Sequence, residues 1–189
     1  MAFTQNSEQI KLTLSTLVTK QRYEHSIRVA DMAFSLAKAH DVNVQSAYYC
    51  GLIHDCAKDI KVDDQRYCFS VDQRRFYELY PAVWHAYVVE VVGKYHFPML
   101  EDDIFLAAKW HTSGKESMSL LEKIIFVSDY LEIGRTIANR QMLTDLAFNS
   151  LDQAISCIAK DKIKLLIDQH KSVYSKLLDC YNFYLNNLG

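Results

Sequence analysis

The sequence predicts an all-α fold formed by a single domain over residues 1–189, and three observations support this prediction. Residues that interrupt helices are rare, with five glycines and two prolines among 189 residues. Residues with high helix propensity occur along the whole chain. Apolar residues recur three and four positions apart, which is the spacing of a buried helical face. A chain of this length can bury roughly 70% of the surface that its unfolded form exposes, so one core is sufficient.

Nine helices are expected, and no repeat, low-complexity tract or linker separates them. In chain order their ranges are 6–20, 22–40, 44–57, 63–79, 82–96, 101–112, 117–133, 140–160 and 161–187. The sixth helix has the clearest start because it follows Pro98 and carries Asp102 and Asp103 in its first turn. Carboxylates at that position interact favourably with the helix dipole.

Five of these helices carry an apolar stripe that includes one polar residue. In the second helix, apolar residues follow His25 at i+4, i+7 and i+11, and in the fifth they follow His85 at i+3, i+4 and i+7. In the third and sixth helices, apolar or small residues precede His54 and His111 by three, four and seven positions. The seventh helix leads to Asp129 in steps of four. Each polar residue is therefore expected on the face that its helix turns inward.

Composition and charge exclude several classes of function. The formal net charge of -2 favours neither nucleic acid nor a membrane surface as a partner. No apolar run approaches the roughly 20 residues of a membrane span, and the polar N-terminus lacks the apolar core of a signal peptide. The five cysteines form no C-x-x-C pair and are expected to be reduced thiols, so the cytoplasm is the expected location. The oligomeric state stays open, with a homodimer as one alternative.

The inward polar residues together indicate a metal site. A single histidine on an apolar stripe is more often a hydrogen-bonded core residue, but an inward carboxylate is costly to bury without a cation. His54 and Asp55 are consecutive and point about 100° apart on a helix, an arrangement that suits a metal better than a packed core. Imidazoles and carboxylates without a thiolate favour iron, manganese or zinc.

The number of candidate ligands predicts two metal ions. The metal-ligand candidates are His25, His54, Asp55, His85, His111 and Asp129. Six ligands would leave one ion no open position for water and substrate. A pair of ions roughly 3.5–4 Å apart and bridged by a carboxylate fits the set better, with a hydroxide between them as the nucleophile for phosphoryl transfer.

Three short motifs carry a family resemblance over about residues 20–185. The stretch 54–58 resembles an H-D-x-A-K motif, 111–114 an H-T-x-G motif, and 129–135 a D-Y-x-E-x-x-R motif. In this order, with His25 before them and His85 between the first two, they resemble the HD superfamily of metal phosphohydrolases. More specifically, together with Met118 they resemble its symmetrical bis(5'-nucleosyl)-tetraphosphatases. The expected fold is therefore an HD-type helical bundle.

The resemblance implies symmetrical hydrolysis of diadenosine tetraphosphate, and of related dinucleoside polyphosphates, to two ADP. It implies the same six ligands, most commonly for iron. Catalytic roles are implied for Asp55, Lys58 and Arg135. Substrate contacts are implied for His25, Lys58, His85, His111, Thr112, Gly114, Asp129 and Arg135. An arginine offers a planar fork to phosphate and a lysine a mobile point charge; Gly114 is expected to let the backbone approach the substrate.

Simpler interpretations stand beside these roles. Lys58 could be a solvated cation at a helix end, and Arg135 could pair with Glu132 or Asp129. Glu132 is expected to orient a ligand or Arg135 rather than to bind metal. The remaining histidines are expected to be structural or on the surface: His40, His96 and His170.

The chain also departs from the family pattern in places that bear on substrate choice. Larger residues follow His85 where small ones are usual, Ser128 replaces alanine and Ile133 replaces proline. The segment 172–177, with Asn182 beyond it, matches the nucleotide-lining segment of the family poorly. Base preference is therefore left open. The alternatives are a phosphohydrolase of another nucleotide, a di-iron oxygenase of the HD type and an inactive nucleotide sensor; the last is disfavoured because every ligand position is kept.

Overall fold

The computed structural model describes residues 2–187, apart from the side chains of residues 2 and 4, and within that range it contains ten α-helices and no strand. All-α architecture is therefore confirmed. The helices are α1 (Ala2–Leu17), α2 (Lys20–Ala39), α3 (Val44–Ile53), α4 (Val71–Leu79), α5 (Pro81–His96), α6 (Asp102–Lys109), α7 (Leu120–Leu131), α8 (Arg140–Asn149), α9 (Leu151–Asp168) and α10 (Ser175–Asn186). Among the described helices, none is long and apolar enough to cross a membrane.

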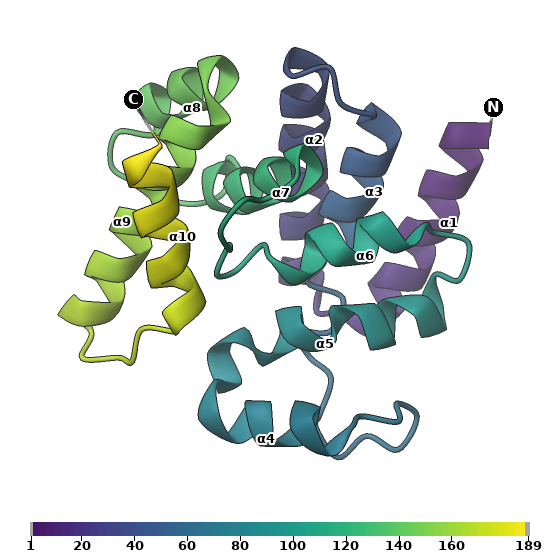
Figure 1. Cartoon of the computed structure of the whole chain (residues 1–189). Helices are drawn as coiled ribbons and strands as arrows, with labels where there is room; N and C mark the ends of the chain where they lie inside the picture. Colours follow the sequence, from purple (N-terminus) through teal and green to yellow (C-terminus); the bar gives the residue numbers. More distant parts are fainter. Residues whose placement is uncertain (1, 188–189) are drawn as a thin grey trace.

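Helix α7 forms the centre of the molecule and packs against α2, α3, α6, α8 and α9 (Figure 1). Its sequence explains this position, because nine of its twelve residues are buried, including the run from Ile124 to Asp129. A capping box fixes its start: the amide of Glu122 donates to the Ser119 hydroxyl, and the amide of Ser119 donates to the Glu122 carboxylate. A helix buried on nearly every side is a rigid platform for Asp129 near its C-terminal end.

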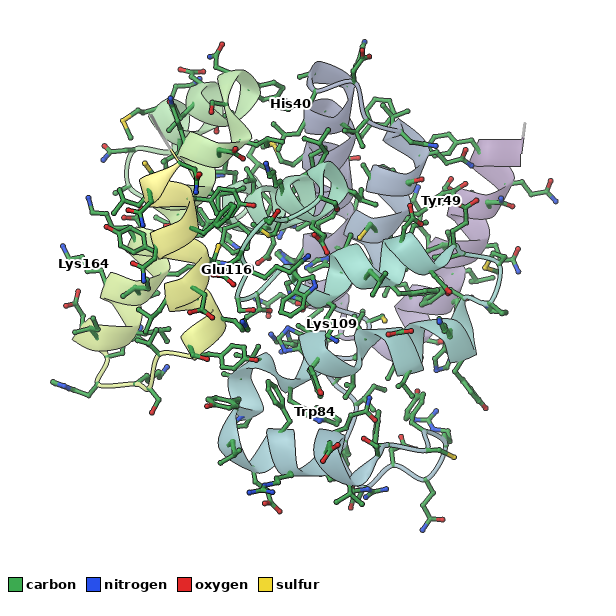
Figure 2. All side chains as sticks on the ribbon, viewed as in Figure 1. His40, Tyr49, Trp84, Lys109, Glu116 and Lys164 are labelled. Atoms are coloured by element: carbon green, nitrogen blue, oxygen red, sulfur yellow. The ribbon has the colours of Figure 1, made fainter. Side chains whose placement is uncertain are left out.

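Two helical hairpins extend from this centre. Helices α4 and α5 form one hairpin at the bottom of Figure 1, and α9 and α10 form the other at its left, with a short loop that joins α9 to α10. The side chains fill most of the space between neighbouring helices in the central part (Figure 2). The turn at Tyr80 and the loop 169–174 come close enough for Tyr80 and Tyr174 to pack with ring centroids 4.6 Å apart. The two hairpins therefore enclose a region next to α7.

The C-terminal helices divide at other points than the sequence predicted. The expected ranges 140–160 and 161–187 are wrong: α8 ends at Asn149, α9 runs to Asp168 and α10 starts at Ser175. Ser150 is the reason for the first break, since its hydroxyl accepts from the amide of Gln153 and starts a new helix. At the second break His170 has a left-handed φ of 53°, a conformation that ends a helix.

Other boundaries also differ from the predicted ones, and the range 6–20 is shifted to Ala2–Leu17. The range 63–79 begins only at Val71, because a capping box between Ser70 and Gln73 starts α4 there and residues 61–69 form turns. The ranges 44–57 and 101–112 end early, at Ile53 and Lys109, and the range 117–133 begins at Leu120. Hydrophobic periodicity continued through turns in these places, because turn residues with buried side chains keep the helical spacing for a few positions.

Candidate metal and phosphate site

The six candidate ligands converge on one buried region from five segments. His25 lies on α2, His85 on α5 and Asp129 on α7, as predicted. The expectation that the others lie within helices is wrong: His54 and Asp55 follow the end of α3, and His111 follows the end of α6. Five of the six are buried, and the His25 side chain is 15% exposed.

The histidines that follow α3 and α6 are oriented by the same kind of hydrogen bond to the backbone. The Nδ1 atom of His54 lies 2.7 Å from the Gly51 carbonyl oxygen, and that of His111 lies 2.7 Å from the Ala108 carbonyl oxygen. Each Nδ1–H donates to a carbonyl oxygen three residues earlier, in the last turn of the preceding helix. The Nε2 atom of each ring therefore keeps its lone pair for the site interior.

Asp55 lies between two groups of ligand atoms. Its carboxylate forms one group with His25 and His54 and a second with His85 and His111, and within each group the ligand atoms lie within 4.8 Å of one another. In the second group, Oδ1 of Asp55 is 3.1 Å from Nε2 of His85 and 3.3 Å from Nε2 of His111. Ligands held at about 2.1 Å by one ion are themselves about 3 Å apart. Both groups thus have the dimensions of a metal-binding cluster and share one carboxylate.

Asp129 and Glu132 approach the cluster from the C-terminal end of α7. Oδ1 of Asp129 is 3.2 Å from Nε2 of His25 and 3.8 Å from Nε2 of His54. On the other side of the His25 ring, Nδ1 is 3.3 Å from Oε1 of Glu132. Glu132 also accepts from Nε of Arg28 at 2.5 Å. The Glu132 carboxylate therefore contacts a candidate ligand, which is the first of the two arrangements expected from the sequence. Arg135 donates its backbone amide to the Glu132 carbonyl oxygen at 3.2 Å.

Two buried polar atoms at the centre lack hydrogen-bond partners among the described residues, and both belong to candidate ligands. They are Nε2 of His54 and Oδ1 of Asp55. An unpaired buried acceptor is costly, whereas bound cations in the two groups would satisfy both atoms. This pairing of orphaned acceptors fits a bound metal ion.

The protonation states support the same fit. Burial lowers the pKa of His54 to about 3 and that of His85 to about 4, so both rings are neutral at pH 7, as metal binding requires. Burial alone would raise the pKa of the Asp55 carboxyl, but the adjacent imidazoles hold it well below its usual range. Burial acts in the same way on Asp129, and there His25 and Arg135 hold the pKa well below its usual range. His54 and His85 thus offer neutral nitrogens, and Asp55 and Asp129 offer ionised oxygens. Burial acts to lower the pKa of His25, but its hydrogen bond to Asp129 raises that pKa overall.

The three predicted phosphate-contacting residues lie beside this cluster. Nζ of Lys58 is 2.9 Å from Nε2 of His85 and 3.8 Å from Oδ1 of Asp55. The Thr112 hydroxyl is 2.9 Å from Nε2 of His111 and 3.2 Å from Nε2 of His85. The Arg135 guanidinium pairs with Asp129. Lys58 therefore contacts the cluster and is not a solvated helix-end cation. Arg135 pairs with Asp129, which is one of the two simpler pairings considered from the sequence.

Gly114 has a different setting from the one expected. Its φ is 63°, and a Cβ atom at this position would lie 2.5 Å from Sγ of Cys180 and 3.2 Å from the Phe126 ring. The glycine thus allows a left-handed turn to pack against α10 and α7. Its contact with substrate stays a prediction, since the described residues that line the adjoining cavity do not include it.

The remaining histidines lie apart from the cluster. His40 Nε2 is 2.7 Å from the Ala147 carbonyl oxygen and joins α2 to α8. His96 Nε2 is 2.8 Å from the Tyr67 hydroxyl. His170 is exposed in the loop after α9. These positions agree with the structural or surface roles expected.

A cavity of about 570 Å³ opens beside the cluster. Its polar end includes Asp55, His111, Thr112, Asp129 and Arg135. Its walls come from the α4–α5 turn (residues 79–83) and from the second hairpin, which contributes Leu165, Leu166, Lys171, Ser172, Tyr174 and Leu177. The volume lies in the range of pockets that hold small ligands. The poorly matching segment 172–177 therefore forms part of the wall, where it bears on what the cavity accepts.

Sequence reasoning missed three cations at this site: Arg22, Arg28 and Lys162. Nη1 of Arg22 is 3.9 Å from Oδ2 of Asp55. Lys162 lines the cavity, and burial lowers the pKa of its ammonium to about 8 against the attraction of Asp129. The signal for Lys162 was present, because it stands seven residues after Ile155 on the buried stripe of α9. The two arginines lacked such a signal, since α2 begins with several charged residues on exposed turns.

Comparison with known proteins identifies the fold. The HD domain model matches residues 22–134, which is more than half of the chain. The chain belongs to the HD domain family. The HD protein is 32% identical to a Staphylococcus aureus protein named symmetrical bis(5'-nucleosyl)-tetraphosphatase, over 95% of this chain and 94% of the relative. It is 27% identical to a Bacillus subtilis protein of the same name, over 94% and 97% of the two chains.

A solved structure agrees with this assignment. The HD protein aligns with a Clostridium acetobutylicum crystal structure, described as a predicted HD superfamily hydrolase involved in NAD metabolism, with a TM-score of 0.79 and 27% identity. The alignment covers 95% of the HD protein and 97% of that chain. Family, relatives and structural neighbour agree that the HD protein is a hydrolase with an HD helical fold.

Proposed function

We propose that the HD protein hydrolyses diadenosine tetraphosphate symmetrically to two ADP, and accepts related dinucleoside polyphosphates. The observation that carries the proposal is the position of Asp55, which belongs to two groups of candidate ligands and lies at the end of a cavity. The names of the S. aureus and B. subtilis relatives supply the substrate. Cations and a hydroxyl at the same end of the cavity suit a chain of phosphates.

The residues proposed to hold two metal ions are His25, His54, Asp55, His85, His111 and Asp129, with Asp55 contributing to both groups of ligand atoms. The set contains four imidazoles and two carboxylates and no thiolate, which favours iron, with manganese or zinc as alternatives. Glu132 would orient His25 through its Nδ1 atom, since the two lie 3.3 Å apart. When bound, the pair of ions lowers the pKa of a water molecule and neutralises charge on phosphoryl oxygens.

The balanced reaction consumes one water molecule. A water oxygen bonds to one of the two central phosphorus atoms, and the bond from that atom to the central bridging oxygen breaks. One ADP leaves with the bridging oxygen, and the other ADP gains the water oxygen. The two protons of the water are released to the products and the solvent. ADP is a leaving group of low pKa, so no general acid is assigned. Asp55, Lys58 and Arg135 are proposed as the catalytic residues.

Charge and position define the proposed contacts with substrate. Lys58 and Arg135 lie at the polar end of the cavity, where they would offset the charge that gathers on the transferred phosphoryl group. Thr112 would donate its hydroxyl to a phosphoryl oxygen, because it directly follows a ligand. The remaining proposed contacts are His25, His85, His111, Gly114 and Asp129.

Product analysis tests the proposal. Purified protein of known metal content is incubated with diadenosine tetraphosphate, and the nucleotides are separated by chromatography. ADP as the single product supports symmetrical cleavage, whereas ATP together with AMP excludes it. Oxygen consumption during turnover would favour a di-iron oxygenase instead, although the cations beside the cavity have no evident role in such a reaction. If the protein hydrolyses only a mononucleotide, the result would support the alternative of an HD phosphohydrolase that acts on another nucleotide.

We also propose that residues 1–189 act as one domain. The family match ends at residue 134, but α9 and α10 provide a wall of the cavity that the matched part opens into. A cytoplasmic location remains part of the proposal, and the five thiols are free, which suits a reducing compartment. The oligomeric state, including a homodimer, is left to direct measurement.

A further inference from the structure

Lys162 stands out because its charge is placed on a buried stripe. Helix α9 turns Ile155, Ile158 and Ala159 toward the core, and Lys162 continues that face one turn later. An apolar residue would extend the stripe at no electrostatic cost, whereas an ammonium loses hydration there. The neighbouring Lys164 provides the contrast, since it lies on the exposed outer side of α9 (Figure 2).

The ammonium of Lys162 is held in one position by backbone and ring contacts. It donates to the carbonyl oxygen of Thr112 at 3.1 Å and to that of His111 at 3.3 Å. It also lies 4.3 Å from the centroid of the Phe126 ring. A lysine ammonium carries three donors, so two carbonyl contacts leave one donor for another acceptor. The side chain lines the cavity, where that acceptor can be a ligand.

The surroundings identify the kind of acceptor. Thr112, Arg135 and Lys162 all line the polar end of the same cavity. The Arg135 guanidinium pairs with the Asp129 carboxylate, so its positive charge is already partly compensated. Lys162 instead hydrogen-bonds to neutral carbonyl oxygens, which do not neutralise its charge, so the ammonium can attract an anion. Phosphoryl oxygens bind such point charges readily.

We propose that Lys162 is a further substrate-binding residue, whose ammonium contacts a non-bridging oxygen of the phosphate chain on the cavity side of the metal cluster. The inference rests on the proposed function only for the identity of the anion. The two carbonyl bonds hold the ammonium in place before substrate arrives, so little side-chain freedom is lost on binding. The structural alternative is that Lys162 only ties α9 to the turn after α6.

Two substitutions separate these roles. K162M removes the charge and both carbonyl bonds, while K162Q removes the charge but keeps a side-chain amide that can donate to a carbonyl. K164M is the matched control, because it removes one positive charge from the exposed side of the same helix. Binding of ADP and of adenosine to the metal-loaded proteins is measured by calorimetry, together with metal content and turnover of diadenosine tetraphosphate.

If Lys162 binds phosphate, K162M and K162Q each weaken ADP binding by about tenfold or more, as the loss of a charged hydrogen bond predicts. Adenosine binding, metal content and the properties of K164M stay at wild-type values. Wild-type ADP affinity in either variant overturns the inference. Equal losses for ADP and adenosine, or loss of metal in both variants, assign Lys162 a structural role and overturn it as well.

The same experiment distinguishes failure of the proposed function. A wild-type protein that neither hydrolyses diadenosine tetraphosphate nor binds ADP contradicts the proposed function itself. A wild-type protein that does both, with unaltered Lys162 variants, contradicts only the role of Lys162.

Discussion

Glu132 lies 3.3 Å from His25, with its Oε1 atom facing Nδ1 of the imidazole. Two further contacts fix the carboxylate: Nε of Arg28 donates to Oε2 at 2.5 Å, and the Gly134 amide donates to the same oxygen at 2.6 Å. A carboxylate that accepts from one ring nitrogen directs the other nitrogen, here Nε2, toward the cluster. The geometry of His25 is thus set from a position outside the ligand set.

Loss of this carboxylate should weaken metal binding. We expect E132Q to lower metal affinity by roughly 10–100-fold, because the amide is a weaker acceptor for the Nδ1–H of His25. Competition with a chelator of known affinity measures the effect. E116Q is the control, because Glu116 is exposed and this substitution removes the same charge from the surface (Figure 2). Unaltered affinity in E132Q would show that His25 does not depend on Glu132.

Removal of the shared carboxylate should abolish catalysis. In D55N the amide cannot bridge two cations, so we expect turnover to fall by roughly a thousandfold or more and metal content to fall below two ions per chain. Metal analysis and initial rates measure both effects. D63N, in the exposed loop after α3, is the control. Full metal content with normal turnover in D55N would refute the bridging role.

Arg135 should affect substrate more than metal. We expect R135A to lower kcat/KM for diadenosine tetraphosphate by roughly 10–100-fold while metal content stays unchanged, because the guanidinium is proposed to contact phosphate and is not among the proposed metal ligands. R135K should recover only part of the loss, since an ammonium lacks the planar fork. Loss of metal from R135A would instead mean that its pairing with Asp129 supports the cluster.

The metal-free protein should lose stability as the pH falls below about 6.5. In the unfolded chain the imidazoles titrate near pH 6.5, whereas burial lowers the pKa of His54 to about 3 and that of His85 to about 4 in the folded protein. Between pH 6.5 and 4 the unfolded chain therefore binds more protons, and the free energy of unfolding decreases with falling pH. The lowered pKa values of Asp55 and Asp129 act in the same direction, but only below about pH 4.

Urea unfolding of the metal-free protein at several pH values measures this slope. H85Q, which cannot take up a proton in the unfolded chain, should flatten it. A slope of the opposite sign, or an identical slope in H85Q, would contradict the buried neutral state of His85.

The contact between α2 and α3 should be sensitive to one methyl group. A Cβ atom on Gly51 would lie 2.6 Å from Cα and 2.9 Å from the backbone nitrogen of Ala30. These backbone atoms cannot move aside cheaply, so we expect G51A to destabilise the protein by about 1–3 kcal/mol. Without the clash, alanine in a helix would stabilise by roughly 0.5–1 kcal/mol. A lower thermal unfolding temperature in G51A would therefore support this close approach of the helices, and a higher one would contradict it.

Several features of the site were accessible from the sequence because they depend on local spacing. His25, His85 and Asp129 continue apolar helical stripes, and they lie on the helices expected for them. The motif at 54–58 pointed to His54 and Asp55, which lie in the cluster of candidate ligands, although they follow α3 instead of lying within it. Their turn is fixed by a bond from the ring to the Gly51 carbonyl, a side-chain contact that periodicity does not reveal.

Other features depend on contacts between distant segments and could not be read from local patterns. Arg22 and Arg28 lie near Asp55 and Glu132 only because α2 packs beside α3 and α7. The break at Ser150 was overlooked because apolar spacing continues across it. The setting of Gly114 depends on Cys180, which is 66 positions later in the chain. Tertiary packing decides each of these, and one sequence does not record it.

The cavity is built from two distant parts of the chain with separate tasks. The candidate ligands all lie between His25 and Asp129, whereas one wall belongs to the hairpin of α9 and α10. Exchange of that hairpin between related proteins could redirect which nucleotide is accepted while the ligand set stays intact, provided that Lys162 is kept. Substrate preference in this fold can therefore diverge through changes confined to its last fifth, apart from that one lysine.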